Sequence, residues 1–131
     1  MGIAQSSESG EHLLRTVEKG RNIWNGKEAD EGYFDLLKSA VEAEGVDINY
    51  RDRDGVTALM IAVVRGDSET VKYLLSKGAN ANIIIYNDNR NTDTVLIISL
   101  QRSFVPSLRV VYSKITKLLI DGGADVNLVI T

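Results

Sequence analysis

The chain has 131 residues, a formal net charge of -3 and no cysteine. This length suits one domain with a continuous core, and the lack of cysteine excludes a disulfide framework and a thiol nucleophile. Acidic and basic residues are interspersed, so charge gives no argument for nucleic-acid binding. Residues 1–30 show no secretory signal, and no apolar run approaches the roughly 18 residues of a membrane span. We expect a cytoplasmic protein, with a nuclear location as the alternative.

The N-terminal residues 1–10 are expected to form a flexible segment. They contain a candidate lipidation site, because Gly2 and Ser6 fit the N-myristoylation pattern. A single myristoyl chain gives only marginal membrane binding, and no neighbouring cysteine offers a second acylation site. Gly2 is therefore a weak candidate, and a membrane is expected as a partner only if Gly2 is lipidated.

Two amphipathic segments, residues 12–20 and 33–43, predict the first pair of helices. The segment between them is polar and contains Trp24, the only tryptophan. We expect Trp24 to cover the exposed end of the packed helices. The alternative is an aromatic anchor for a partner, since tryptophan is enriched in interface hot spots. The positions expected to face inward are Leu13, Leu14 and Val17 in the first helix and Phe34, Leu37, Ala40 and Val41 in the second.

The next segment, residues 50–82, predicts two short helices joined by a tight turn. Thr57 precedes an apolar run and is expected to be its N-cap. Gly66 separates the two helices, and Gly78 ends the second as its C′ residue. Neither helix can bury its apolar face alone, so neighbouring units must supply the stability. The inward positions, three and four residues apart, are Leu59, Ala62, Val63, Val71, Leu74 and Leu75.

Residues 83–127 predict a similar but longer unit. The apolar, β-prone stretch Ile83–Tyr86 precedes the polar turn Asn87–Asn91, which predicts a protruding hairpin. Its apolar strand is expected either to pack on the neighbouring unit or to contact a partner. Pro106 is expected in a loop or a first helical turn, with Phe104 before it as a contact candidate. The inward stripe of the helix that follows is Leu108, Val111, Ile115, Leu118 and Leu119.

These three segments share their endings, which read EGVDIN to Asn49, GANAN to Asn82 and GGADVN to Asn127. The spacing is 33 residues for the first pair and 45 for the second. A period of about 33 residues is typical of ankyrin arrays, in which each unit is a turn and two antiparallel helices. The chain therefore resembles the ankyrin-repeat family. The matching positions in the middle unit are Asp52, Gly55, Thr57, Leu59, Ala62, Gly66, Val71, Leu74, Leu75, Gly78, Ala79 and Asn82.

The resemblance implies an all-α ankyrin-repeat solenoid of helix-turn-helix units with β-hairpin finger turns. The domain is expected over residues 11–131, with units at about 11–49, 50–82 and 83–127. The resemblance also implies binding of a partner protein through the finger turns and the concave face of the first helices. The implied contact positions are Arg51, Arg53, Asp54, Val56, Val64 and Arg65 in the middle unit, and Asp88, Arg90, Asn91 and Asp93 in the third finger.

No residue pattern predicts catalysis, a metal or a cofactor. His12 is the only histidine, and no serine lies in an elbow-like glycine motif to pair with it. Asp52 and Asp54 flank a turn, where aspartate commonly bonds its own backbone. We therefore expect an interaction module and no enzyme. The alternatives are a regulatory or targeting unit, a fragment of a larger ankyrin-containing protein, and self-association through an apolar C-terminal end.

Overall fold

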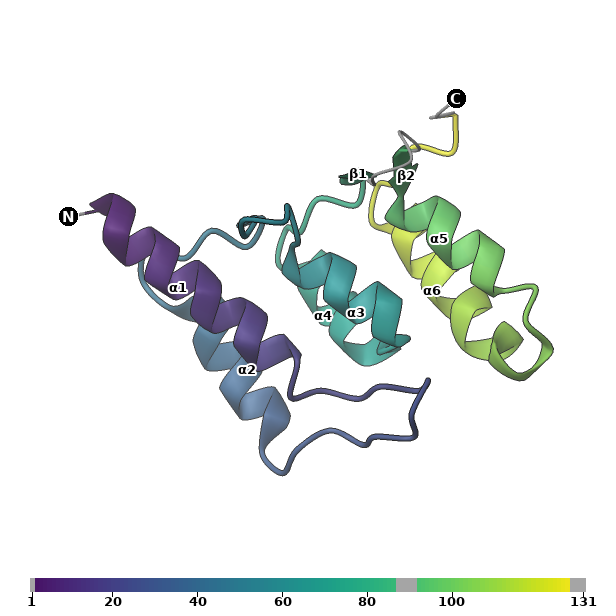
Figure 1. Ribbon diagram of the computed structural model, residues 1–131, viewed down its shortest axis with the longest axis horizontal. Coiled ribbons are helices and arrows are strands. Elements are labelled where there is room, and N and C mark those ends of the chain that lie inside the picture. The colour runs from purple at the N-terminus through teal and green to yellow at the C-terminus, as the bar shows by residue number, and fades with distance from the viewer. Residues whose placement is uncertain (1, 87–91, 128–131) are drawn as a thin grey trace.

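The computed structural model describes residues 2–86 and 92–127, and the side chains of all of these except 2–6, 86 and 92. Helices in this part of the chain pair side by side in three consecutive units (Figure 1). The predicted all-α repeat architecture is confirmed. The pairs are α1 (Gly2–Val17) with α2 (Tyr33–Glu42), α3 (Ala58–Arg65) with α4 (Ser68–Ser76), and α5 (Val95–Arg102) with α6 (Arg109–Asp121).

The middle unit forms as its sequence predicts, because its signals are local. Thr57 precedes α3, and its hydroxyl accepts a hydrogen bond from the backbone N–H of Met60 at 3.2 Å. Asp67 caps α4 by accepting from the N–H of Thr70 at 3.3 Å. Gly66 ends α3 with φ at 72°, and the side chain of Ile23 fills the space that a Cβ at this position would need.

The third unit also agrees with its prediction. Strands β1 (Ile84–Tyr86) and β2 (Thr92–Thr94) pair antiparallel, and the turn Asn87–Asn91 lies outside the described residues. Ile83 is buried and Ile85 packs against the core, so this strand packs on the molecule. Pro106 opens the short 3₁₀ helix η1 (Pro106–Leu108) that leads into α6. The predicted stripe faces inward: Ile115 and Leu119 are buried, and Leu108, Val111 and Leu118 are half-buried against them.

The first helix starts earlier than predicted. The sequence pattern placed its start at His12, whereas α1 begins at Gly2 and includes most of the segment expected to be flexible. Gly10 lies against the ring of Tyr50, where any Cβ would collide with that ring. The Tyr50 hydroxyl also donates a hydrogen bond to the carboxylate of Glu11 at 2.8 Å. These contacts hold the helix upstream of its apolar stripe.

The second helix faces inward as predicted at Leu37, Ala40 and Val41, but its first turn differs from the prediction. Tyr33 is buried, whereas Phe34, which was expected to face inward, is exposed. The Tyr33 hydroxyl forms a buried hydrogen bond of 2.9 Å with the hydroxyl of Thr70, which in turn donates to Asp67 at 2.5 Å. Burial of the phenol raises the pKa of Tyr33 to about 12. A polar contact with the next unit therefore decides which ring faces inward.

Trp24, in the loop between α1 and α2, was expected to cover the exposed end of the stack. The loop takes a different course. It extends across the end of α3 toward the third unit (Figure 1). The N–H of Ile23 donates to the carbonyl of Arg65 at 3.0 Å, and the indole Nε1 of Trp24 donates to the Tyr112 hydroxyl at 2.9 Å. Lys27 holds the loop together by donating to the carbonyls of Lys19 and Gly20, each at 3.1 Å.

The C-terminal carbonyls of α3 are the meeting point of the three units. The last carbonyls of a helix have no partner within it. The buried Tyr112 hydroxyl lies 3.0 Å from the carbonyl oxygens of both Val63 and Val64, and its single proton is shared between them. The guanidinium of Arg102 donates to the Val64 carbonyl at 2.8 Å. The first unit supplies Ile23 and the third supplies Tyr112 and Arg102, so both neighbours cap the middle helix.

A second set of bonds joins the turns of successive units. The side-chain carbonyl of Asn49 accepts from the N–H of Asn80 at 2.8 Å, and that of Asn82 accepts from the N–H of Asp125 at 2.7 Å. Asn82 also donates to the carbonyl of Gly123 at 3.0 Å. The asparagines that close the first two repeated endings, Asn49 and Asn82, therefore link their own units to the next.

Replacing Tyr112 with phenylalanine should lower the free energy of unfolding by about 1 to 3 kcal/mol, because it removes the hydroxyl that serves two carbonyls and the Trp24 indole. Urea denaturation measures this loss. Tyr73→Phe is the matched control: the Tyr73 hydroxyl is buried and has no hydrogen-bond partner among the described residues. That variant should be neutral or slightly stabilised, and equal losses in both would contradict the role of the Tyr112 hydroxyl.

Stability should fall between pH 10 and 12 because of Tyr33. The pKa of its hydroxyl is about 12 in the folded protein and 10.0 in the unfolded chain, so the unfolded state loses its proton first. The contribution of the Tyr33 hydroxyl to the free energy of unfolding is fully present below pH 10. It decreases by about 2 to 3 kcal/mol as the pH rises to 12. Tyr33→Phe should reduce the fall by that amount in urea titrations at pH 9 and pH 12. Phe34→Leu should keep it, and an unchanged fall in Tyr33→Phe would contradict the assignment.

Candidate functional site

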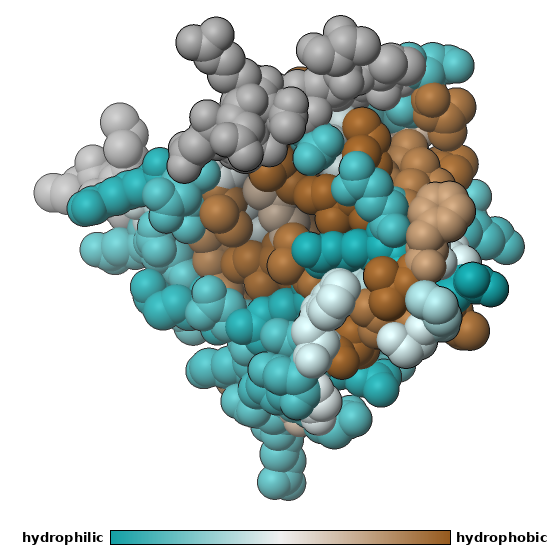
Figure 2. Space-filling model, turned by 45° about the vertical axis from the view of Figure 1, so that its right-hand side comes forward, coloured by the Kyte–Doolittle hydropathy of each residue, from teal (hydrophilic) through white to brown (hydrophobic). Residues whose placement is uncertain are grey.

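The side of the molecule formed by α1, α3 and α5 carries a groove of about 340 Å³, which we call the first-helix groove. Figure 2 shows apolar side chains gathered on this side. The groove wall is almost entirely apolar, with one acidic and one basic residue at its edge. The lining residues are Glu18, Val56, Met60, Ile61, Val64, Arg65 and Ile85.

Three elements position the groove wall. Val56 follows the finger turn, and its backbone N–H donates to the carboxylate of Asp52 at 2.9 Å. On α3, Met60 lies four residues before Val64 and Ile61 lies three residues before it. Residues with these spacings are neighbours on one side of a helix. Ile85 comes from β1 of the third unit. The groove therefore depends on the packing of the third unit against the middle one.

A second hollow of about 270 Å³ adjoins this groove and shares Val64 and Arg65 with it. Its other walls are Asn22, Trp24 and Arg102. The indole of Trp24 is half exposed, and the Arg102 guanidinium lies 4.9 Å from its ring centroid. A cation at this distance over a tryptophan face is attracted by the ring. We call this second hollow the Trp24 hollow.

Backbone carbonyls fix the arginines beside the groove. Arg65 donates to the carbonyl of Glu18 at 3.0 Å, which ties the end of α3 to the first unit. Arg51 donates to the carbonyls of Gly55 and Ile84, at 3.1 and 3.3 Å. It therefore connects the middle finger to β1. Arg53, two residues further on, is exposed at the finger itself.

The structure brings together only part of the predicted contact set. Val56, Val64 and Arg65 line the first-helix groove, and the exposed Arg53 and Asp54 lie on the finger that leads to it. The other predicted positions that the structure describes do not line this groove. Phe104 is exposed in the loop after α5, and Asp93 is half-buried in β2. Asp88, Arg90 and Asn91 fall outside the described residues. Gly2 is the first residue of α1, and its lipidation stays a prediction.

Sequence reasoning missed several residues of the two hollows. Met60 and Ile61 could have been found from their spacing to Val64. Arg102 occupies the position in the third unit that Arg65 has in the middle one, counted from the capping residues Thr94 and Thr57. Glu18 and Asn22 come from the first unit, and no local pattern marks them. Trp24 and the strand that contains Ile85 were named in the sequence only as alternative partner contacts.

Other kinds of site receive no support from the described residues. Within residues 2–86 and 92–127, no three His, Asp or Glu side chains gather as metal ligands would. None of the helices described is long and apolar enough to cross a bilayer alone. Residues 95–102 and 106–121 reach that length and composition only as a pair bent by 117°.

Comparison with known proteins identifies the repeat. A family model described as ankyrin repeats, in three copies, matches residues 27–130. Segments of the chain are also similar to parts of much longer proteins. The chain is 39% identical over 51 residues to alpha-latrocrustotoxin-Lt1a of Latrodectus tredecimguttatus, 36% over 59 to the serine/threonine-protein kinase TNNI3K of Mus musculus, and 36% over 56 to palmitoyltransferase akr1 of Schizosaccharomyces pombe.

These matches cover 39%, 45% and 43% of this chain but only 4%, 7% and 9% of the respective relatives. The similarity is therefore confined to a small part of each relative.

Proposed function

This chain belongs to the ankyrin-repeat family, whose repeats generally serve as protein-interaction modules, and we propose that it binds a partner protein through the first-helix groove and the Trp24 hollow. The observation that carries this proposal is the apolar groove on the side formed by α1, α3 and α5, continuous with a half-exposed tryptophan beside an arginine. Tryptophan and arginine are enriched among the residues that dominate interface energies.

The groove favours a partner that inserts an apolar side chain. Val56, Met60 and Ile85 give it an apolar wall, so an aliphatic or aromatic side chain placed there would leave water at little polar cost. Glu18 and Arg65 at its edge offer both signs of charge to the flanking residues of the partner. The adjoining Trp24 hollow offers a large aromatic face to a second residue of the same segment.

The walls are also fixed before binding. Arg65, Arg102 and Trp24 each form a hydrogen bond to another unit, so ordering them on binding costs little conformational entropy. A pre-formed surface of this kind favours binding without rearrangement of the backbone.

We propose binding and no catalysis for this chain. The relatives named as a kinase and a palmitoyltransferase share with it only 7% and 9% of their lengths, so their activities give no reason to assign a reaction here. The ankyrin repeat itself is a non-catalytic interaction fold.

The proposal predicts that Val64→Lys weakens partner binding at least about tenfold, because Val64 lies in both hollows and loss of a hot-spot contact costs about 2 kcal/mol or more. Three baits are compared by affinity capture and quantitative mass spectrometry: the intact chain, Val64→Lys and Val110→Lys. A protein enriched on the first bait is then titrated against all three.

Val110→Lys is the matched control, since Val110 is highly exposed on α6 and lines neither hollow. Circular dichroism establishes that both variants are folded. The expected partner binds the intact chain and Val110→Lys equally well and binds Val64→Lys weakly. A partner that binds both variants with the affinity of the intact chain would place the binding surface elsewhere.

A further inference from the structure

The Trp24 hollow is lined by two arginines that no carboxylate of the described chain neutralises. Arg65 and Arg102 occupy the same position in α3 and α5, counted from the threonine that caps each helix. Both line this hollow. Neither guanidinium forms an ion pair with an Asp or Glu of the part of the chain that the structure describes. The repeat therefore brings two positive charges to the wall of one hollow.

Each of these arginines keeps an unused pair of donor nitrogens. Among the described residues, Arg65 uses only Nη1, which donates to the Glu18 carbonyl at 3.0 Å. Arg102 likewise uses only Nη1, which donates to the Val64 carbonyl at 2.8 Å and to the Tyr112 hydroxyl at 3.3 Å. Nε and Nη2 form the edge of a guanidinium whose parallel N–H groups match the two oxygens of a carboxylate. One nitrogen therefore fixes each side chain, and the matching edge stays open to a ligand.

The other walls of the hollow combine a further donor with apolar surface. The side-chain oxygen of Asn22 accepts the backbone N–H of Trp24 at 3.0 Å, so the remaining polar group of this amide is its NH₂ donor. Val64 and the half-exposed ring of Trp24 supply the apolar part. None of the described residues that line the hollow is acidic. Its walls therefore suit a ligand that carries a negative charge on an apolar stem.

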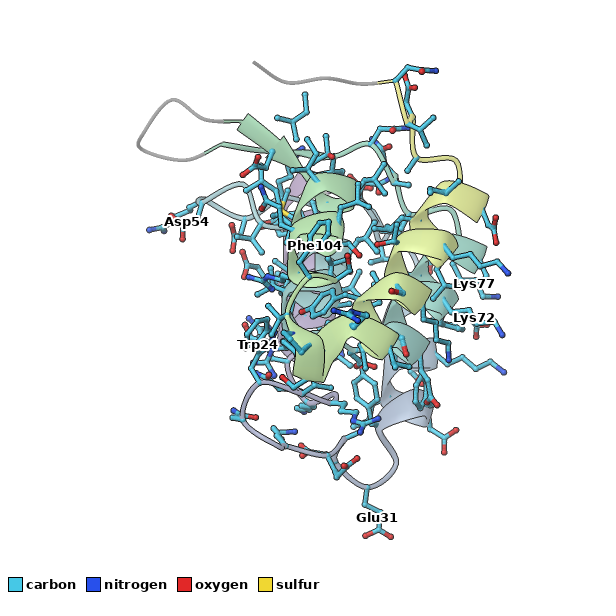
Figure 3. The ribbon with its side chains drawn as sticks, turned by 90° about the vertical axis from the view of Figure 1, so that its right-hand side faces the viewer. Trp24, Glu31, Asp54, Lys72, Lys77 and Phe104 are labelled. Atoms are coloured by element: carbon cyan, nitrogen blue, oxygen red, sulfur yellow. The ribbon has the colours of Figure 1, made fainter. Side chains whose placement is uncertain are left out.

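Figure 3 shows Trp24 on the same side of the molecule as Asp54 of the middle finger, and away from Lys72 and Lys77 on the opposite side. The hollow lies on the side that carries the first-helix groove, with which it shares part of its lining. A segment bound in the groove can therefore place a neighbouring residue in the hollow.

We propose that the Trp24 hollow binds the side-chain carboxylate of a glutamate, carried by the partner segment whose apolar residue fills the first-helix groove. Arg65 and Arg102 pair with the carboxylate, which also relieves the repulsion between the two guanidiniums. Val64 and the Trp24 ring cover the methylene groups of the glutamate. Phosphoserine has a shorter apolar stem, so the apolar walls favour glutamate. This inference rests on the proposed function and adds to it the charge of the partner segment.

A phage-displayed library of random peptides, selected on the intact chain, tests this assignment. Enriched peptides are expected to combine an apolar residue with a nearby glutamate. Glutamine in place of that glutamate should raise the Kd of the synthetic peptide at least about tenfold, because it removes charge-assisted hydrogen bonds. This comparison uses the intact chain, so it does not depend on the folding of a variant.

Arg65→Gln and Arg102→Gln then locate the contact. Each should weaken binding of the glutamate peptide at least about tenfold and binding of the glutamine peptide far less, because only the first peptide loses an ionic partner. Arg109→Gln is the matched control, since Arg109 is exposed on α6 and lines neither hollow. It removes the same charge and should leave both Kd values unchanged. Circular dichroism establishes that each variant is folded.

Three results would overturn the proposal. Equal weakening of the two peptides by the arginine variants would show that these side chains act only on the fold. Tighter binding of a phosphoserine peptide than of the glutamate peptide would assign the hollow to a phosphoryl group. A selection that yields no acidic peptide would also overturn it. If the apolar peptides from such a selection lose binding to Val64→Lys, the proposed function stands and the glutamate site alone fails.

Discussion

The capping of the α3 C-terminus is the interaction on which the rest of the structure depends. A helix of eight residues leaves its last carbonyls without intrahelical partners, and a buried carbonyl that lacks a partner costs about 1 to 3 kcal/mol. The N–H groups of Gly66 and Asp67 serve Val63 and Ala62 within the unit. The donors to the last two carbonyls come from outside it: Tyr112 and Arg102 of the third unit donate to Val64, and Ile23 of the first donates to Arg65. The middle helix is therefore complete only when both neighbours are folded against it.

This arrangement also connects stability to the proposed binding surface. Trp24 and Arg102 line the Trp24 hollow, and each also belongs to the hydrogen-bond network around Tyr112. Moving either side chain toward a partner would break bonds that hold the units together. The surface should consequently act as a rigid template, and a substitution there can change binding and stability at once. Controls for folding are needed wherever binding is measured.

The sequence predicted the local parts of this fold well and the long-range parts poorly. Thr57, Gly66 and Gly78 act within a few residues of themselves, so their patterns were sufficient to place the middle helices. The contact of Trp24 with Tyr112 joins residues 88 positions apart, and no pattern in either segment marks it. Helical periodicity could not choose between Tyr33 and Phe34, because the hydrogen bond to Thr70 decides the matter. Of the residues that line the first-helix groove, only Val56, Val64 and Arg65 were predicted as contact positions; Glu18 comes from another unit, where no local pattern marks it.

A double-mutant cycle between Trp24 and Tyr112 tests the central claim most directly. Trp24→Phe, Tyr112→Phe and the double variant each keep an aromatic ring, so the cycle isolates the bond between the indole and the hydroxyl. If this bond connects the first unit to the third, the unfolding free energies will be non-additive by about 0.5 to 1.5 kcal/mol. Losses that add to within about 0.3 kcal/mol would show that the loop and the third unit are stabilised independently, and would contradict the account.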